Sequence, residues 1–364
     1  MNIDFANLKL AYKDHQETFE KEIFKVLKSA SYIMGPEVER LELELSKFSG
    51  AKHTISCSSG TDALLLSMMA IDIGPGDEVI TTPFTFISTA ETIALLGAKP
   101  VFVDIDRDSY NIDNSKIEEK ISDKTKAIIP VSLFGQVANM DEINTLAKKH
   151  HLSVIEDAAQ SFGATYKDKK SCNLSSLGCT SFFPAKPLGC FGDGGAVFTN
   201  NEALAKKIKN LRVHGQTKPY VHKHIGLGAR LDNLQAAVLL IKLKSYNEAV
   251  KMRQAAAENY NKMLNGVVKT PVIKDYNSSV WAQYSIGIPS RDMIKLKLKD
   301  LGIPTAIYYP VPLHLQECFE YLGYKKGDFP ISEKAAEEIL SLPINPYITE
   351  EEQKYIVEEL KKCL

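Results

Sequence analysis

Short apolar runs alternate with helical stretches between about residues 50 and 200, and this alternation constrains the fold most. The runs cover 53–58, 78–83, 99–105, 126–134, 152–158, 179–183 and 195–200. They are apolar throughout, which is typical of strands in a parallel sheet whose two faces are both covered by helices. In the intervening segments, such as 61–73 and 140–151, apolar residues recur at helical spacing. Strands and helices that alternate in this way indicate repeated βα units. We therefore expect an α/β fold with a mainly parallel central sheet.

The chain has 364 residues, enough for more than one hydrophobic core. A long amphipathic helical stretch at 230–264 follows the alternating region, and shorter strands with proline-bearing loops come after it. This change in the pattern of strands, helices and loops predicts a domain boundary near residue 245. We expect a large domain over 1–245 and a smaller C-terminal α+β domain over 246–364.

Charge and composition exclude several classes of partner. The 44 basic and 45 acidic residues give a net charge of -1, which offers no electrostatic footprint for nucleic acid or an anionic membrane. We see no secretory signal and no run of about 20 apolar residues, so we expect a cytoplasmic protein without a membrane span. The 6 cysteines lack paired C-x-x-C spacing, which favours reduced thiols over a metal site.

Lys186 has an unusual setting among many lysines. It lies in TSFFPAKPLGCFGDGGA (180–196), between an apolar strand and a glycine-rich turn. Pro184 fixes its own φ, and Pro187 biases Lys186 away from the helical region, so this loop is stiff. A solvated loop lysine is the alternative, but the neighbouring phenylalanines, cysteines and glycines disfavour it. The pattern indicates a lysine that is aimed at a target.

Asp157 ends the apolar strand in IEDAAQS (155–161). In doubly wound sheets, ligands bind outside the carboxyl ends of the strands, where this side chain would lie. A buried carboxylate there needs a cationic partner, because an isolated charge is costly in an apolar medium. A pyridinium nitrogen is one such partner. A helix cap or a structural ion pair remains an open alternative.

Two further segments suit a flat phosphorylated cofactor. In SCSSGTDALLL (56–66), Gly60 lets the backbone approach a ligand, the free N–H groups of the helix start favour an anion, and Thr61 adds a hydroxyl. In the segment after the next strand, Phe84 or Phe86 can stack on a ring, unless both are core residues. With the lysine and the aspartate, these features are the parts that pyridoxal phosphate needs.

The order and wording of these motifs resemble the DegT/DnrJ/EryC1/StrS family of sugar aminotransferases over nearly the whole chain. The resemblance implies a pyridoxal-phosphate-dependent transferase of fold type I, with a large domain and a smaller C-terminal one. The fragments that carry it are YIMGPEVE (32–39), SGTDAL (59–64), GPGDEVI (74–80), FTFISTAE (84–91), IEDAAQSFGA (155–164), SFFPAKPLGCFGDGGA (181–196), RLDNLQAA (230–237) and YYPVPLHLQ (308–316).

The resemblance also implies roles for single residues around the cofactor. Lys186 would form the internal aldimine, and Asp157 would pair with the pyridinium nitrogen. The other expected cofactor contacts are Gln160 with the ring hydroxyl, Phe86 stacked on the ring, and Gly60, Thr61 and Ser181 with the phosphate.

The family's active sites lie at a homodimer interface, and the stretch before RLDNLQAA reaches the neighbouring subunit's site. The expected substrate-binding residues are Arg230, Tyr308, Tyr309 and His314; for the last three, a proline-framed surface loop is the alternative. The chain departs from the family at Gly228, where an asparagine usually contacts the partner's phosphate. No metal is expected.

Fragments 171–190 and 211–216 are most similar to enzymes that aminate C3 of UDP-N-acetyl-3-oxo-hexoses. We therefore expect amino transfer from L-glutamate, leaving 2-oxoglutarate, to C3 of a UDP-2-acetamido-3-oxo-hexose or hexuronate in lipopolysaccharide, O-antigen or lipid A sugar biosynthesis. A 4-keto-6-deoxy nucleotide sugar is the alternative acceptor. A sugar dehydratase of the same fold carries histidine at the lysine position, so Lys186 argues against it. A non-catalytic sugar-nucleotide sensor also remains open.

Overall fold

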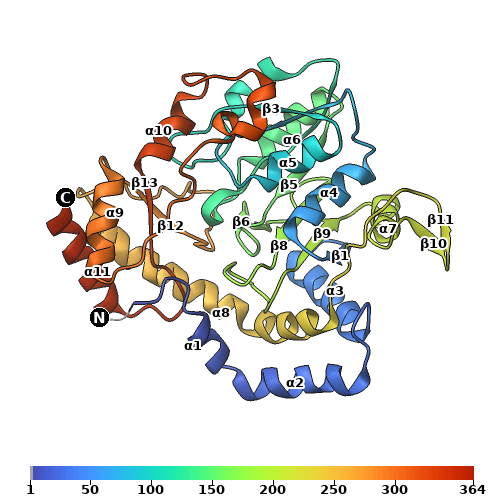
Figure 1. The fold of residues 1–364 in the computed structure, drawn as a ribbon, viewed down its shortest axis with the longest axis horizontal. Coiled ribbons are helices and arrows are strands. Elements are labelled where there is room, and N and C mark those ends of the chain that lie inside the picture. Colours follow the sequence, from blue (N-terminus) through green and yellow to red (C-terminus); the bar gives the residue numbers. More distant parts are fainter. Residues whose placement is uncertain (1–2) are drawn as a thin grey trace.

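A seven-stranded sheet forms the centre of the molecule in the computed structural model, which describes residues 3–364. Met1 and Asn2 of the expected large domain lie outside the described residues. The strand order is β1-β9-β8-β5-β4-β2-β3 (Figure 1). The strands are β1 (His53–Cys57), β2 (Glu78–Thr81), β3 (Lys99–Phe102), β4 (Thr125–Ile128), β5 (Ser153–Asp157), β8 (Leu177–Ser181) and β9 (Gly195–Thr199).

The pairing of these strands is parallel from β3 through β2, β4 and β5 to β8. Only β9 runs the other way, because it pairs antiparallel with both β8 and β1. Every apolar run noted in the sequence contributes one strand, and the expected α/β fold with a mainly parallel sheet is confirmed. The run at 195–200 differs in direction because the loop 182–194 contains no crossover helix and leads β9 back alongside β8.

Helices cover both faces of the sheet. Buried residues of α4 and α7, such as Leu66 and Ile208, pack with Ile155 and Val197 on one face. On the other face, α2, α3 and α8 form a second cluster that includes Leu41. The helices of this part are α1 (Leu8–Lys13), α2 (Gln16–Ser29), α3 (Pro36–Ser49), α4 (Gly60–Ala70), α5 (Ser88–Leu95), α6 (Met140–Lys149), α7 (Glu202–Leu211) and α8 (Asn233–Leu264).

The C-terminal part has its own core around a two-stranded antiparallel sheet. Tyr260 and Leu264 of α8 pack there with Trp281, and Ile3 from the N-terminal segment joins them. The elements of this part are β12 (Tyr284–Gly287), α9 (Arg291–Asp300), α10 (Pro330–Glu338), β13 (Ile339–Leu342) and α11 (Glu350–Cys363). Two small strand pairs lie outside both sheets, β6 (Thr165–Tyr166) with β7 (Lys169–Lys170) and β10 (Gln216–Lys218) with β11 (Val221–His222).

Helix α8 connects the two cores (Figure 1). Its first half, including Leu239, packs on the large-domain cluster, and its last turns pack on the C-terminal one. The expected domain boundary near residue 245 falls inside this continuous 32-residue helix, so that boundary stays a prediction. Within residues 3–364, no helix combines the length and hydropathy that a bilayer span requires.

Candidate active site

Asp157 lies at the carboxyl end of β5 and is 4% exposed. Its Oδ2 accepts a hydrogen bond of 2.8 Å from the Thr89 hydroxyl, and its Oδ1 accepts one of 3.2 Å from the Ala159 N–H. Burial raises the pKa of Asp157 above its ordinary value, while these hydrogen bonds and the charge of Lys186 oppose the rise. The carboxylate therefore lacks a full cationic partner, and a bound cation would stabilise its charge.

Lys186 lies in the turn between β8 and β9, where its N–H donates to the Phe183 carbonyl at 2.8 Å. The residue is partly exposed, but desolvation of its amine lowers the pKa of Lys186, and the charge of Asp157 opposes that shift. The charges of the predicted lysine and aspartate thus influence each other's pKa. A lysine whose ammonium is destabilised is suited to act as a neutral nucleophile or base.

The first turns of α4 and α5 meet beside the end of β8. Thr61 of α4 and Ser88 of α5 share a hydrogen bond of 2.8 Å between their hydroxyls. Gly60 lies against Ser181, so closely that an added Cβ would be 2.7 Å from the Ser181 Cβ. Two helix N-termini with adjacent hydroxyls favour an anion through their free N–H groups and dipoles. The structure thus brings the expected phosphate contacts together, and it adds Ser88.

Gly60→Ala is expected to disturb the anion cradle, the group formed by Gly60, Thr61, Ser88 and Ser181. The new methyl would push Ser181 away, and overpacking of this kind costs about 1–3 kcal/mol, which corresponds to a loss of about 5- to 150-fold in cofactor affinity. Titration of the purified protein with pyridoxal phosphate measures this loss. Gly74→Ala is the matched control, because a Cβ there would meet nothing within 4 Å. Equal affinities in both variants would contradict the assignment.

The aromatic candidates are separated by burial. Phe84 is fully buried, whereas Phe86 is 54% exposed and its ring centroid lies 6.3 Å from that of Tyr309. The Gln160 side chain joins the same group, since its Nε2 donates to the Tyr309 hydroxyl at 3.0 Å and its Oε1 accepts from the Phe134 N–H at 2.8 Å. Phe86 is therefore the phenylalanine of this segment that is free to meet a ring.

Sequence reasoning missed the hydroxyl partners Thr89 and Ser88. Thr89 contacts Asp157 across 68 positions of sequence, which no local pattern reveals. A usable signal was present, because hydroxyl residues in the first turn of a helix after a parallel strand face the carboxyl edge of the sheet. Both residues lie in the first turn of α5.

Glu156 is a fully buried carboxyl group on the strand beside Asp157. It accepts hydrogen bonds from the Ser171 hydroxyl at 2.9 Å and the Cys172 N–H at 2.8 Å, and from Ser132 at 3.3 Å. Burial is the largest effect on this group and raises the pKa of Glu156 to about 7. The sequence shows two adjacent carboxylates. It does not reveal that Glu156 belongs to a buried hydrogen-bond network separate from that of Asp157.

This raised pKa predicts a pH-dependent stability. Because the folded pKa of Glu156 exceeds the unfolded one, its stabilising effect is complete below about pH 4.5 and is lost as the pH rises through 7. Between pH 5 and 8, we expect the free energy of unfolding to fall by about 2–3 kcal/mol more in the wild type than in Glu156→Gln. Urea unfolding at both pH values measures this difference, and parallel declines would refute it.

Within the part of the chain that the structure describes, the remaining predicted residues make no hydrogen bond or ion pair with Lys186 or Asp157. Arg230 is partly exposed, and its side chain makes no hydrogen bond or ion pair within residues 3–364. Gly228 is exposed, and an added Cβ there would lie 3.0 Å from the His214 ring. Tyr308 is partly buried beside Tyr309.

His314 is only 2% exposed. Its Nε2 lies 3.1 Å from the Glu333 carboxylate, and its ring packs on Phe329 at 4.7 Å between centroids. Neither contact reaches the Lys186 and Asp157 pair. Its expected role in binding the sugar stays a prediction.

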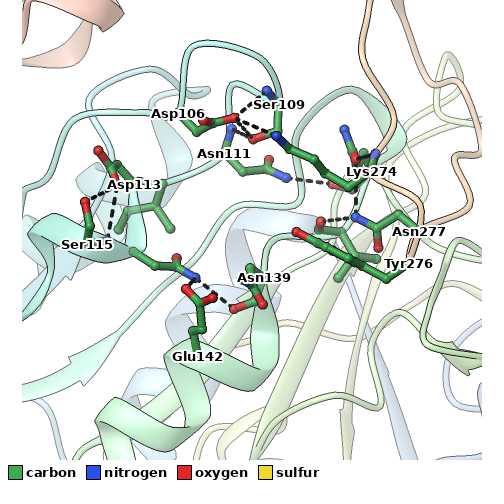
Figure 2. A pocket seen from close by; sticks show the side chains of 14 residues that line it. Asp106, Ser109, Asn111, Asp113, Ser115, Asn139, Glu142, Lys274, Tyr276 and Asn277 are labelled. Atoms are coloured by element: carbon green, nitrogen blue, oxygen red, sulfur yellow. Dashed lines mark hydrogen bonds and ion pairs between the residues drawn. The ribbon is translucent and has the colours of Figure 1, made fainter.

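A separate polar cavity of about 240 Å³ contains none of these residues. Figure 2 shows it between the loop after β3, the start of α6 and residues 274–277, with Asp106, Asn139 and Lys274 on its wall. Its polar groups mostly bond to one another, as where Lys274 lies 3.9 Å from Asp106. Within the described residues, no cluster of three or more His, Cys, Asp or Glu side chains suits a metal ion.

We assign the fold to the type I class of pyridoxal-phosphate enzymes, because its parallel sheet presents a lysine, an aspartate and an anion cradle at one edge. The chain belongs to the DegT/DnrJ/EryC1/StrS aminotransferase family, whose model matches residues 13–361. The expected family, fold class and enzyme type are confirmed.

Individual relatives cover nearly the whole chain. UDP-2-acetamido-2-deoxy-3-oxo-D-glucuronate aminotransferase of Pseudomonas aeruginosa is 50% identical over 95% of this chain and 96% of its own. The pleiotropic regulatory protein of Geobacillus stearothermophilus is 45% identical over 99% and 98%. The crystal structure of NtdA from Bacillus subtilis, with bound cofactor PMP, superimposes with a TM-score of 0.92 at 32% identity, covering 100% of this chain and 85% of that one. Pyridoxal phosphate is the cofactor of this enzyme.

Proposed function

We propose that this enzyme transfers the amino group of L-glutamate to C3 of a UDP-linked 2-acetamido-3-oxo sugar. The interaction of Lys186 with Asp157 is the observation that carries the proposal, since amino transfer needs a proton carrier and a charge that fixes the cofactor ring. The 50% identical Pseudomonas relative supports the acceptor class, because its name specifies a 3-oxo UDP sugar. On this proposal the cytoplasmic product enters lipopolysaccharide, O-antigen or lipid A sugar biosynthesis.

The residues of the site fit the cofactor. Gly60, Thr61 and Ser181 would hold the phosphate, and the exposed ring of Phe86 would stack on the pyridine. Asp157 would pair with the ring nitrogen, while Gln160 contacts the ring hydroxyl. The Asp157 carboxylate has the burial and the missing cationic partner that a pyridinium requires.

Bound pyridoxal phosphate supplies a ring that takes up electron density from the donor's α-carbon. Lys186 would accept the proton from that carbon and return it at C4′ of the cofactor, and this role suits an amine whose pKa burial has lowered. Asp157 would keep a proton on the ring nitrogen by stabilising its positive charge. In the second stage, Lys186 would carry a proton from C4′ to the sugar carbon that receives the nitrogen, and the oxygen of the sugar carbonyl would leave as water.

We also propose a homodimer whose subunits share their active sites. Exposed apolar side chains lie on α2, at Phe24, and in the loop of Lys186, at Phe183 and Phe191. A second copy that covers them would remove this apolar surface from water. We also propose that Arg230, whose side chain has no partner within residues 3–364, binds the sugar nucleotide together with Tyr308, Tyr309 and His314.

Incubation with glutamate and a panel of UDP-3-oxo, UDP-4-oxo and dTDP-4-oxo sugars tests the substrate. Mass and NMR analysis of the products should find amination at C3 of the UDP-3-oxo sugars. Amination only of 4-oxo-6-deoxy sugars would replace this proposal with the alternative acceptor.

A sensor function is the second candidate, because the Geobacillus relative is named a pleiotropic regulatory protein. The near-visible absorbance of the protein with its cofactor separates the two functions. A band that shifts when glutamate is added supports amino transfer. A band unaffected by glutamate, together with binding of a sugar nucleotide, would support the sensor.

A further inference from the structure

The loop that carries Lys186 closes on itself between β8 and β9. At its base, the Cys190 N–H donates to the Phe182 carbonyl at 2.8 Å. Next to this base, Gly189 packs so tightly that an added Cβ would be 2.4 Å from the Pro184 carbonyl oxygen. The loop therefore moves as one unit, and its position depends on the contacts that it makes with the rest of the protein.

Two side chains of α8 make such contacts with the loop. The Gln235 Oε1 accepts a hydrogen bond of 2.8 Å from the Phe191 N–H. The Lys242 Nζ donates to the Gly189 carbonyl at 2.6 Å and lies 4.9 Å from the centroid of the Phe191 ring. These contacts fix the loop to a helix that is itself anchored in the large-domain core.

Lys242 has a costly environment for a lysine. Burial lowers the pKa of Lys242 to about 8, and the only opposing effect comes from Cys190. No carboxylate pairs with it among the ion pairs of residues 3–364. A lysine used only for solubility would remain in water, whereas this one gives up hydration to bind a carbonyl and a ring.

We propose that Lys242 is a positioning residue that holds the Lys186 loop in place for proton transfer. This inference rests on the proposed function, because it assigns the catalytic amine to Lys186. Gln235 shares the task through the adjacent amide. Small displacements of a reacting group cost large factors in rate, so loss of this contact should affect turnover more than substrate binding.

Amide hydrogen exchange of the loop, in protein without cofactor, tests the proposal independently of activity. In Lys242→Met, the hydrogen-bonded amides of Lys186, Cys190 and Phe191 should exchange about tenfold faster, because the loop loses a charged hydrogen bond. Lys242→Arg should remain close to wild type, since a guanidinium can also donate to the Gly189 carbonyl. Lys251→Met is the matched control on α8, where Lys251 forms only a surface pair with Glu248.

The rate of the glutamate half-reaction is the second readout. We expect the maximal rate of Lys242→Met to fall about tenfold at an unchanged half-saturating glutamate concentration, with recovery in Lys242→Arg. Unchanged loop exchange in Lys242→Met would overturn the proposal. Faster exchange with an unchanged rate would also overturn it, because the lysine would then be only structural. A wild type without amino transfer would refute the proposed function instead, while the exchange result would still report on the contact.

Discussion

Lys186→Ala is expected to lower amino transfer by about 10⁴-fold or more, since a positioned acid-base group alone contributes about 10²–10⁴-fold and the covalent attachment of the cofactor is lost as well. The side chain lies in a partly exposed turn, so its removal leaves no large cavity in the core. The phosphate cradle at Gly60 and Thr61 is untouched. We therefore expect the variant to fold and to bind the cofactor without covalent attachment.

Single-turnover measurements with glutamate test this expectation. Lys186→Arg is the companion variant, because it retains a positive charge near Asp157 but cannot become a neutral amine. Both variants should be inactive with unfolding temperatures near that of wild type. Transamination at the wild-type rate in either variant would exclude Lys186 as the catalytic amine.

Asp157→Asn is expected to lower the rate by about 10²–10³-fold, a loss comparable to the removal of one preorganised electrostatic partner of a transition state. The amide has nearly the same shape, and its oxygen can still accept the hydrogen bond from Thr89. It cannot balance the positive charge on a protonated ring nitrogen. The ring would then take up less electron density as the proton leaves the donor.

Stability separates this electrostatic role from a structural one. Burial raises the pKa of Asp157, so its ionised form is disfavoured in the protein without cofactor. In that protein, Asp157→Asn should lose no more stability near neutral pH than the one hydrogen bond from the Ala159 N–H, about 1 kcal/mol, while the rate with cofactor falls. Thr89→Val is the control for the hydrogen bond, and we expect a smaller loss of rate from it. A large loss of stability in Asp157→Asn would contradict the assigned role.

The sequence predicts the features that depend on short stretches of chain. Apolar runs mark the sheet strands because buried parallel strands need side chains of one kind on both faces. The Lys186 turn and the start of α4 are equally local, since proline and glycine restrict or free the backbone at single positions. For these features, residue type and spacing were sufficient.

Features that depend on distant contacts were not predictable in this way. Gln160 contacts Tyr309 across 149 positions, and Lys242 reaches Gly189 from another element. The choice between Phe84 and Phe86 required burial, because both follow the same strand with the same chemistry. The direction of β9 depends on the helix-free loop 182–194 that connects it to β8, and the apolar content of the strand does not encode that direction.

Reduction of the cofactor-loaded protein with borohydride, followed by peptide mass mapping, tests the central claim most directly. This treatment fixes the cofactor covalently to the lysine that binds it. Our account predicts a pyridoxyl group on the peptide that contains Lys186. A label on Lys242, the other desolvated lysine beside this loop, or on no lysine would contradict it.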